Sequence, residues 1–403
     1  GSPEVTRSVL GTISLLFKST KSFKNSMDGN VIISITQSIL NIIAATEPTH
    51  YDMILDCLQV LLDMCKNSEF CKALYDDDEP WHRIIECCSM SVRVYTNTME
   101  NTISGTNGPS FINSELSPEN AEKLKVVISG LKVMSRIIDV VLGFGTTVRG
   151  VCEYFPYMYV DVVSILCKTS DKEVVSESLK LLKKLEEART RTKSVGNTQM
   201  LSLLFSSLSS SCLNRIGKIE SESDEESVST VIADEGIVGL LVGMYVFSNL
   251  SKQRFACIAE PWTKSFNSNI MSIKLASCRS LRIILKTISP DMILPEILTE
   301  VGPQLFRILQ NDDIVNSSLC EPIVMECMQL ILELSLMNEN LVDIAVVALF
   351  RVAVQTESMD LRFTARECLV TIATECQQKF KSRVQTLPAL AQDELKKVLL
   401  AQS

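Results

Sequence analysis

Histidine and tryptophan are scarce in this chain, with two residues of each among 403. No Cys-x-x-Cys pair occurs among the 14 cysteines, and with so little imidazole a zinc site is not expected. Most cysteines lie within apolar stretches, where a free thiol behaves as a small buried hydrophobic group in a reducing compartment. We therefore assign no metal ligand.

Recognisable catalytic motifs are missing as well. The sequence has no nucleophile elbow, no phosphate-binding GxxxxGK[ST] loop and no HExxH motif. Gly143-Phe144-Gly145 follows no predicted strand and is typical of a helix terminus or an inter-repeat turn. His82 and Cys87 are five residues apart on a predicted helix, a spacing that does not place both side chains on the same face. We assign no catalytic or cofactor-binding residue and expect the protein not to be an enzyme.

Long basic runs and long apolar runs are also absent. The net charge is -9, whereas nucleic-acid binding needs a concentrated positive surface, so nucleic acid is not expected as a partner. No apolar run reaches the length of a transmembrane helix, and no signal peptide is visible. These features predict a cytoplasmic protein. Gly1-Ser2 is typical of a cloning remnant, so we expect a fragment of a longer protein.

What the sequence does contain is a series of amphipathic helices. Only 15 glycines and 12 prolines occur, and the prolines lie mainly between stretches with helical apolar spacing. Ile54, Leu58 and Leu61 form one such apolar stripe, and similar stripes recur along the chain. About sixteen helices of 12–20 residues would account for the length. Helices in series, each covered by its neighbours, predict an all-α fold of the HEAT/armadillo-type α-solenoid class.

Three helix starts share a tighter pattern, in which an aliphatic residue is followed four residues later by a small residue and eight residues later by Leu. The three sets are Val174, Ser178 and Leu182, then Ile273, Ser277 and Leu281, then Leu361, Ala365 and Leu369. Asp171 and Ser358 precede two of them as capping residues. This pattern resembles the second helix of a HEAT repeat, in which the small residue permits close approach of the partner helix.

The predicted helices fall into three groups, residues 1–104, 121–216 and 231–403. An inter-helix loop at 105–120 and an acidic, Ser-rich loop at 217–230 separate them. Ser221 and Ser223 lie upstream of acidic residues, a context that acidophilic kinases favour, so both are candidate phosphorylation sites. The alternative is a solvated loop without a regulatory role.

The region from Trp262 to Leu400 has a helix order similar to that of one family. Its features are a short helix at Trp262–Phe266, the run Ile273–Cys278, a Pro-flanked helix at Pro295–Leu309, Met328–Leu334, Ala365–Ile372 and a final amphipathic helix. It resembles the C-terminal region of the p200, or HEAT-repeat-containing protein 5, family, which accompanies the type-1 clathrin adaptor. The resemblance implies a non-enzymatic, cytosolic scaffold for endosome-to-Golgi vesicle traffic. Such a scaffold would bind adaptor components and associate peripherally with endosome or trans-Golgi membranes.

A solenoid binds partners over several repeats, so we expect contacts on the ridge of second helices. The candidate partner-binding residues are Arg279, Arg282, Arg362 and Arg366. Packing and helix capping are the competing roles for these arginines. Self-association is also expected, because the ends of a repeat array expose apolar faces.

The roles of two further residue clusters stay open. Tyr154, Phe155, Tyr157 and Tyr159 form the densest aromatic group, which is typical either of an interface or of core packing. The main basic cluster contains Lys183, Lys184, Arg189, Arg191 and Lys193. It is typical of a surface for an acidic partner, of a membrane-binding surface or of a solvated helix end.

Two alternative functions are known for acidic or repeat-built solenoids. An importin-like transport receptor would also be acidic and Cys-rich. A tubulin-binding array would need Trp and Lys in successive turns, whereas only Trp81 and Trp262 are present.

Overall fold

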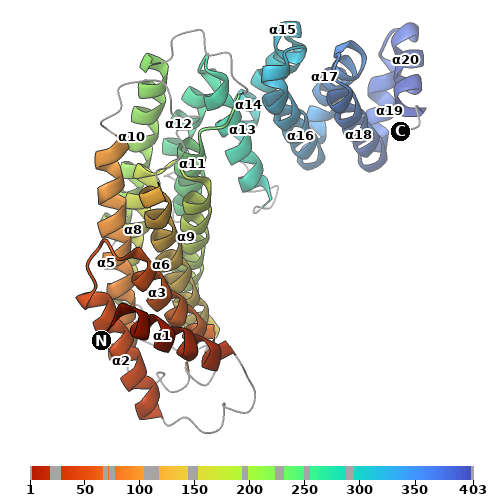
Figure 1. The fold of residues 1–403 in the computed structure, drawn as a ribbon. Coiled ribbons are helices and arrows are strands. Elements are labelled where there is room, and N and C mark those ends of the chain that lie inside the picture. The colour runs from red at the N-terminus through yellow and green to blue at the C-terminus, as the bar shows by residue number, and fades with distance from the viewer. Residues whose placement is uncertain are drawn as a thin grey trace. The chain divides into compact units, whose positions relative to one another are not determined.

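A computed structural model describes residues 2–18, 29–66, 71, 78–103, 118–143, 153–192, 198–222, 231–248, 255–286 and 295–400. Within these ranges the chain forms eighteen α-helices, two short 3-10 helices and no strand (Figure 1). The predicted all-α class is confirmed, and the helix number is close to the predicted sixteen. The chain divides into two compact units, residues 1–208 and 209–403.

Unit 1 consists of two layers of helices. The first layer holds α2 (Gly29–Ala45), α5 (Asp78–Ile103) and α8 (Phe155–Lys168), and the second holds α1 (Pro3–Lys18), α3 (Tyr51–Lys66), α6 (Pro118–Gly143) and α9 (Lys172–Thr192). Helices of one layer pack against the next helix of the same layer, and α2, α5 and α8 each pack on the second-layer helix that follows them. Repetition of this two-helix unit is the arrangement of an α-solenoid.

Unit 2 repeats the same plan. Its first layer contains α12 (Phe255–Asn267), α14 (Pro295–Gln310) and α17 (Val342–Gln355), and its second contains α11 (Glu235–Ser248), α13 (Met271–Leu285), α16 (Glu321–Met337) and α18 (Met359–Glu375). The connections hold α15 (Asp312–Val315), η4 (Ser318–Cys320) and η5 (Glu339–Leu341), and α19 (Gln377–Gln385) and α20 (Ala389–Leu400) pack on α17 and α18. The boundary between the units falls within α10 (Thr198–Glu222).

The three predicted HEAT-like second helices are α9, α13 and α18, and all three lie in a second layer. The small residue of each pattern, Ser178, Ser277 or Ala365, is completely buried. The Asp171 carboxylate accepts hydrogen bonds from the backbone N–H groups of residues 173 and 174, and the Ser358 hydroxyl accepts one from that of residue 361. The predicted capping is therefore confirmed for α9 and α18.

Helix α6 also has a small residue where it packs closely against a neighbouring helix, a feature that was not predicted from the sequence. Gly130 lies between the buried side chains of Val126 and Met134, one turn away on either side. A Cβ atom built on Gly130 would lie 2.9 Å from Val92 Cγ2 and 3.5 Å from the carbonyl oxygen of Cys88. Both contact residues belong to α5. Glycine at this position therefore allows α6 to approach α5 closely.

Two predicted loop boundaries need correction. Helix α6 begins at Pro118, inside the predicted loop at 105–120, because proline is well suited to the first turn of a helix. Helix α10 continues to Glu222, although the acidic loop was predicted to start at Gly217. One glycine costs a helix only about 1 kcal/mol, and Lys218 Nζ lies 3.8 Å from Glu222 Oε1 one turn away. Residues 104–117 and 223–230 lie outside the described residues.

Charged and polar groups tie α1 to α3 in unit 1. Asp63 of α3 is buried, and its carboxylate accepts a hydrogen bond of 2.8 Å from the Ser14 hydroxyl of α1. Lys18 Nζ and Lys66 Nζ lie 3.0 and 3.3 Å from the same carboxylate. Burial alone would raise the pKa of Asp63, but hydrogen bonds from Gln59, Ser14 and Lys18 outweigh burial and lower it below its ordinary value of 3.8.

This lowered pKa makes the contribution of Asp63 to stability depend on pH. Because the pKa of Asp63 is lower in the folded state, its ionised carboxylate stabilises that state at pH values above the unfolded-state pKa. This stabilisation is lost as the pH falls below 3.8 toward the folded-state pKa. We expect Asp63→Asn to lower the free energy of unfolding by about 2 kcal/mol at neutral pH, with a smaller difference below pH of about 4. Urea unfolding at a series of pH values measures this. Asp52→Asn is the control, since that carboxylate is largely exposed. A pH-independent difference between Asp63→Asn and the unmodified protein would contradict the expectation.

Candidate functional site

Two of the four predicted partner-binding arginines lie between second-layer helices of unit 2. Arg279 of α13 forms an ion pair with Glu235 of α11. Arg282, also on α13, lies 2.9 Å from Glu326 and 3.0 Å from Glu333, both on α16. The Arg282 side chain is only 15% exposed. These two arginines thus join consecutive helices of the same layer.

The electrostatics of Arg282 agree with a structural role. Burial opposes its charged form, but the hydrogen bond to Glu333 and the negative charges of Glu326 and Glu333 outweigh burial and raise the pKa of the guanidinium. One oxygen of Glu333, Oε2, is buried without a hydrogen-bond partner. This carboxylate therefore depends on the guanidinium for compensation of its burial.

The other two predicted arginines lie on α18. Arg362 is exposed, and its Nε donates a hydrogen bond of 2.6 Å to the carbonyl oxygen of Thr356 just before the helix. Arg366 is half-buried and has no ion pair or hydrogen bond to any residue that the structure describes. The structure thus separates the four arginines, since one pair bridges helices through carboxylates and the other pair has no acidic partner within the described ranges.

Beside Arg362 and Arg366 runs a row of exposed apolar side chains, which the sequence analysis did not identify. Met359, Phe363 and Val370 of α18 are 73%, 46% and 41% exposed. They point away from the buried face of the helix, which is formed by Leu361, Ala365, Cys368, Leu369 and Ile372. Their helical spacing is visible in the sequence, but it does not by itself show that this side of the helix faces outward.

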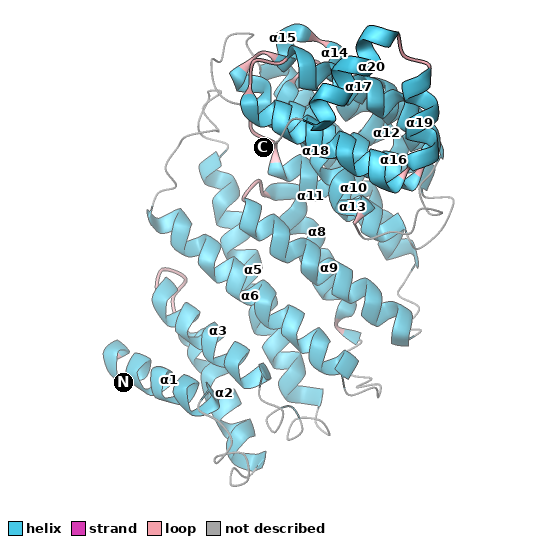
Figure 2. Cartoon of the chain, turned by 90° about the vertical axis from the view of Figure 1, so that its right-hand side faces the viewer, coloured by secondary structure: helices cyan, strands magenta, loops and turns pink. Residues whose placement is uncertain are grey.

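The neighbouring helix α16 carries a matching row. Leu336 is 41% exposed, and Met325, Gln329 and Leu332 are half-buried on the same side of the helix. Helices α16 and α18 pack side by side in the second layer (Figure 1). Figure 2 shows the same part of the chain from the right-hand side of Figure 1. We call the outward side of these two helices the α16–α18 face.

The aromatic group of unit 1 divides between core and surface. Phe155 is buried, and Tyr159 is buried with its hydroxyl donating a hydrogen bond of 2.7 Å to Glu186. Tyr154 stacks on His82 with ring centroids 4.0 Å apart, and Tyr157 lies beside Tyr154 and is mostly exposed. The group therefore serves core packing at two positions and leaves one tyrosine at the surface.

Carboxylates oppose most of the described side chains of the predicted basic cluster. Lys184 Nζ lies 2.7 Å from Asp139, and Arg189 and Arg191 pair with Glu186 and Glu187 on their own helix. Lys193 lies outside the described residues. The cluster is thus mainly part of the inter-helix and intra-helix pairing of unit 1.

The two candidate phosphorylation sites have different outcomes. Ser221 is exposed in the last turn of α10, where its hydroxyl donates a hydrogen bond of 2.8 Å to the carbonyl oxygen of Lys218. Ser223 lies outside the described residues. Phosphorylation of either serine stays a prediction.

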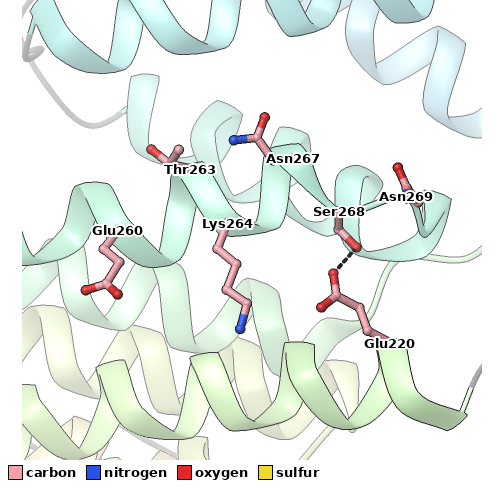
Figure 3. Close-up of a pocket in the computed structure, with 7 residues that line it drawn as sticks. All are labelled: Glu220, Glu260, Thr263, Lys264, Asn267, Ser268 and Asn269. Atoms are coloured by element: carbon pink, nitrogen blue, oxygen red, sulfur yellow. Dashed lines mark hydrogen bonds between the residues drawn. The ribbon is translucent and has the colours of Figure 1, made fainter.

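Unit 2 also has an open, polar pocket of about 610 Å³ (Figure 3). Its lining residues are Glu220, Glu260, Thr263, Lys264, Asn267, Ser268 and Asn269. Ser268 donates a hydrogen bond of 2.7 Å to Glu220 and accepts one of 3.3 Å from the backbone N–H of Ile270, at the start of α13. Ser268 thus organises the start of a helix, and the lining residues that the structure describes include neither histidine nor cysteine.

The described cysteines are free thiols, and most are buried. Cys278 and Cys327 lie on adjacent helices with their Sγ atoms 3.8 Å apart. Burial raises the pKa of Cys57 and of Cys212 to about 12 and that of Cys368 to about 11, which disfavours the reactive thiolate. Across the described ranges, no three His, Cys, Asp or Glu side chains are placed to hold a metal ion.

Comparison with known proteins adds no functional information. No protein-family model matches the chain, and no curated protein matches it. A crystal structure described as an engineered protein aligns with 99% of this chain and 91% of its own, at 14% sequence identity and a TM-score of 0.34. This similarity is too weak to establish a shared fold. No helix among the described residues is both long and apolar enough to cross a membrane.

Proposed function

We propose that the protein is a non-enzymatic HEAT-repeat scaffold that binds other proteins on its second-layer helices. The observation that carries the proposal is the α16–α18 face, where Met359, Phe363, Val370 and Leu336 are exposed on adjacent helices. Exposed apolar side chains that gather on one surface are typical of protein–protein contact sites. An extended surface made of repeated helices is also the usual binding surface of solenoid proteins.

The cellular setting that we propose is clathrin-adaptor-linked vesicle traffic between endosomes and the Golgi. Its support is the resemblance of Trp262–Leu400 to the C-terminal region of the HEAT-repeat-containing protein 5 family. In this setting the protein would associate peripherally with endosome or trans-Golgi membranes, and components of the type-1 clathrin adaptor would be its partners.

Co-precipitation from cells tests this setting. The tagged protein is expected to recover subunits of the type-1 clathrin adaptor, and the recovered proteins are identified by mass spectrometry. An unrelated α-solenoid with the same tag and similar net charge serves as the control. Repeated recovery of other partners without adaptor subunits would refute the trafficking assignment.

A further inference from the structure

The outward side of α18 has the spacing of a coiled-coil seam. Met359, Phe363, Arg366 and Val370 follow one another at intervals of four, three and four residues, which is the alternation of d and a positions in a heptad. Helix α18 already packs on α16 and α17 through its opposite face. It therefore presents a second, unoccupied helix-binding seam among the residues that the structure describes.

The adjacent helix extends this seam into a two-helix surface. Met325, Gln329, Leu332 and Leu336 of α16 have the same four, three and four spacing and are half-buried or exposed. A helix laid beside α18 would therefore contact apolar side chains of α16 as well. Binding of an amphipathic helix to a surface made by two others is a common mode of peptide recognition.

Charge at the centre of the seam defines what such a helix must carry. Arg366 occupies a d position, and no described carboxylate pairs with it. Arg362 borders the seam in a g position, where its guanidinium hydrogen-bonds only to a backbone carbonyl oxygen among the described groups. Asp360 and Glu367 occupy e positions on the opposite border. A guanidinium covered by an incoming helix needs a carboxylate opposite it, because an unpaired buried charge is costly.

Arg366 also argues against a second copy of α18 as the occupant. In a parallel pair, d positions face each other, so Arg366 would meet Arg366 of the other copy. In an antiparallel pair, d faces a, so the guanidinium would be covered by Phe363 or Val370. Neither arrangement places a carboxylate directly opposite the guanidinium, because Asp360 and Glu367 of the copy occupy border e positions and not a or d positions. The seam therefore fits a different helix better than its own copy.

We propose that the α16–α18 face binds an amphipathic helix of a partner protein whose apolar stripe contains one acidic residue, placed opposite Arg366. This inference rests on the proposed scaffold function and adds the chemistry of the partner. Apolar residues of the partner cover Met359, Phe363 and Val370, and its carboxylate pairs with the guanidinium. The ion pair sets the register of the two helices, as a single polar residue does in coiled coils.

Two synthetic helical peptides test the proposal with the 403-residue chain. Each has about three heptads, Leu at the seam positions and Gln or Ala elsewhere, and they differ in one central seam residue, Glu or Lys. We expect the Glu peptide to bind about tenfold more tightly or better, measured by fluorescence anisotropy. Arg366→Glu is expected to reverse this preference. Equal affinity for both peptides, or no binding of either, would overturn the proposal.

Matched variants separate the seam from general effects. Lys381→Glu makes the same change of charge on exposed α19 and is expected to leave the peptide preference unchanged. Phe363→Ala is expected to lower the affinity for the Glu peptide about tenfold. Leu390→Ala, at an exposed apolar position of α20, is expected to leave this affinity unchanged. Circular dichroism and thermal unfolding verify that each variant folds. Equal losses for Phe363→Ala and Leu390→Ala would count against the seam.

Two competing occupants are tested in the same assay. Phosphatidylserine vesicles that displace the Glu peptide, with displacement lost in Phe363→Ala, would replace the proposal with a membrane surface. Self-association that competes with the peptide and depends on Arg366 would replace it with a second copy. Failure to recover clathrin adaptor subunits, with peptide binding intact, would refute the trafficking assignment and leave the proposed surface standing.

Discussion

Replacement of Gly130 by leucine is expected to lower the free energy of unfolding by about 3 kcal/mol. Even a single Cβ atom at this position would lie 2.9 Å from Val92 Cγ2, closer than a van der Waals contact. Valine in a helix has one strongly preferred rotamer, so Val92 cannot turn away easily. The larger side chain must therefore separate α5 from α6, which pack closely in unit 1. Urea unfolding followed by circular dichroism measures the effect.

Two further variants show whether close packing is the cause. In Gly130→Ala the contact with Val92 opposes a gain in helix propensity of about 1 kcal/mol. With Val92→Ala in the background, the same change is expected to become clearly less unfavourable, because the opposing methyl group is gone. Gly217→Ala is the control, since open space surrounds this glycine in α10, and it is expected to stabilise the protein by about 1 kcal/mol. A cost for Gly130→Ala that is independent of Val92 would contradict this account.

Replacement of Arg282 by methionine is expected to cost about 3 kcal/mol of stability, because it leaves Glu326 and Glu333 without their shared counter-charge. Both carboxylates are mostly buried on the same helix. The free energy of unfolding, measured by urea titration, reports the loss. Glu326→Gln together with Glu333→Gln in the methionine background is expected to restore much of it, because the uncompensated charges are then removed.

This prediction also separates two roles for the arginines. A structural residue lowers stability when it is replaced, whereas a residue that only contacts partners does not. We expect Arg282→Met to destabilise the protein and Arg366→Met to leave the free energy of unfolding nearly unchanged, within about 0.5 kcal/mol. Unchanged stability of Arg282→Met would show that the contacts with α16 contribute little.

Local patterns in the sequence predicted the parts of the fold that depend on neighbours within one helix. Asp171 and Ser358 cap their helices as expected, and Ser178, Ser277 and Ala365 are buried where the repeat pattern places them. These features need only the spacing of residues along one helix. The all-α class followed from the same spacing.

Features that depend on contacts between helices were harder to predict. The local sequence does not distinguish Gly130 from any other helix glycine, because Val92 is distant in the sequence and its contact appears only when α5 and α6 pack. Arg282 was expected to face partners, but Glu333, 51 residues later, approaches it in the fold. The apolar seam of α18 was not predicted. Its spacing was present in the sequence, but burial of the opposite face was needed to show that it is outward.

The reactivity of the buried thiols reports local opening of the helices around them. Cys57, Cys88, Cys212, Cys327 and Cys368 lie on five different helices along the chain, and each is buried. A thiol reagent modifies such a group only when the surrounding helices open, so the rate at each cysteine reports the free energy of opening there. The stability of each helix pair depends mainly on its contacts with neighbouring pairs. The modification rates would therefore measure how local stability varies along the array. Partner binding at one repeat would then be visible as slower modification of the thiols nearest to it.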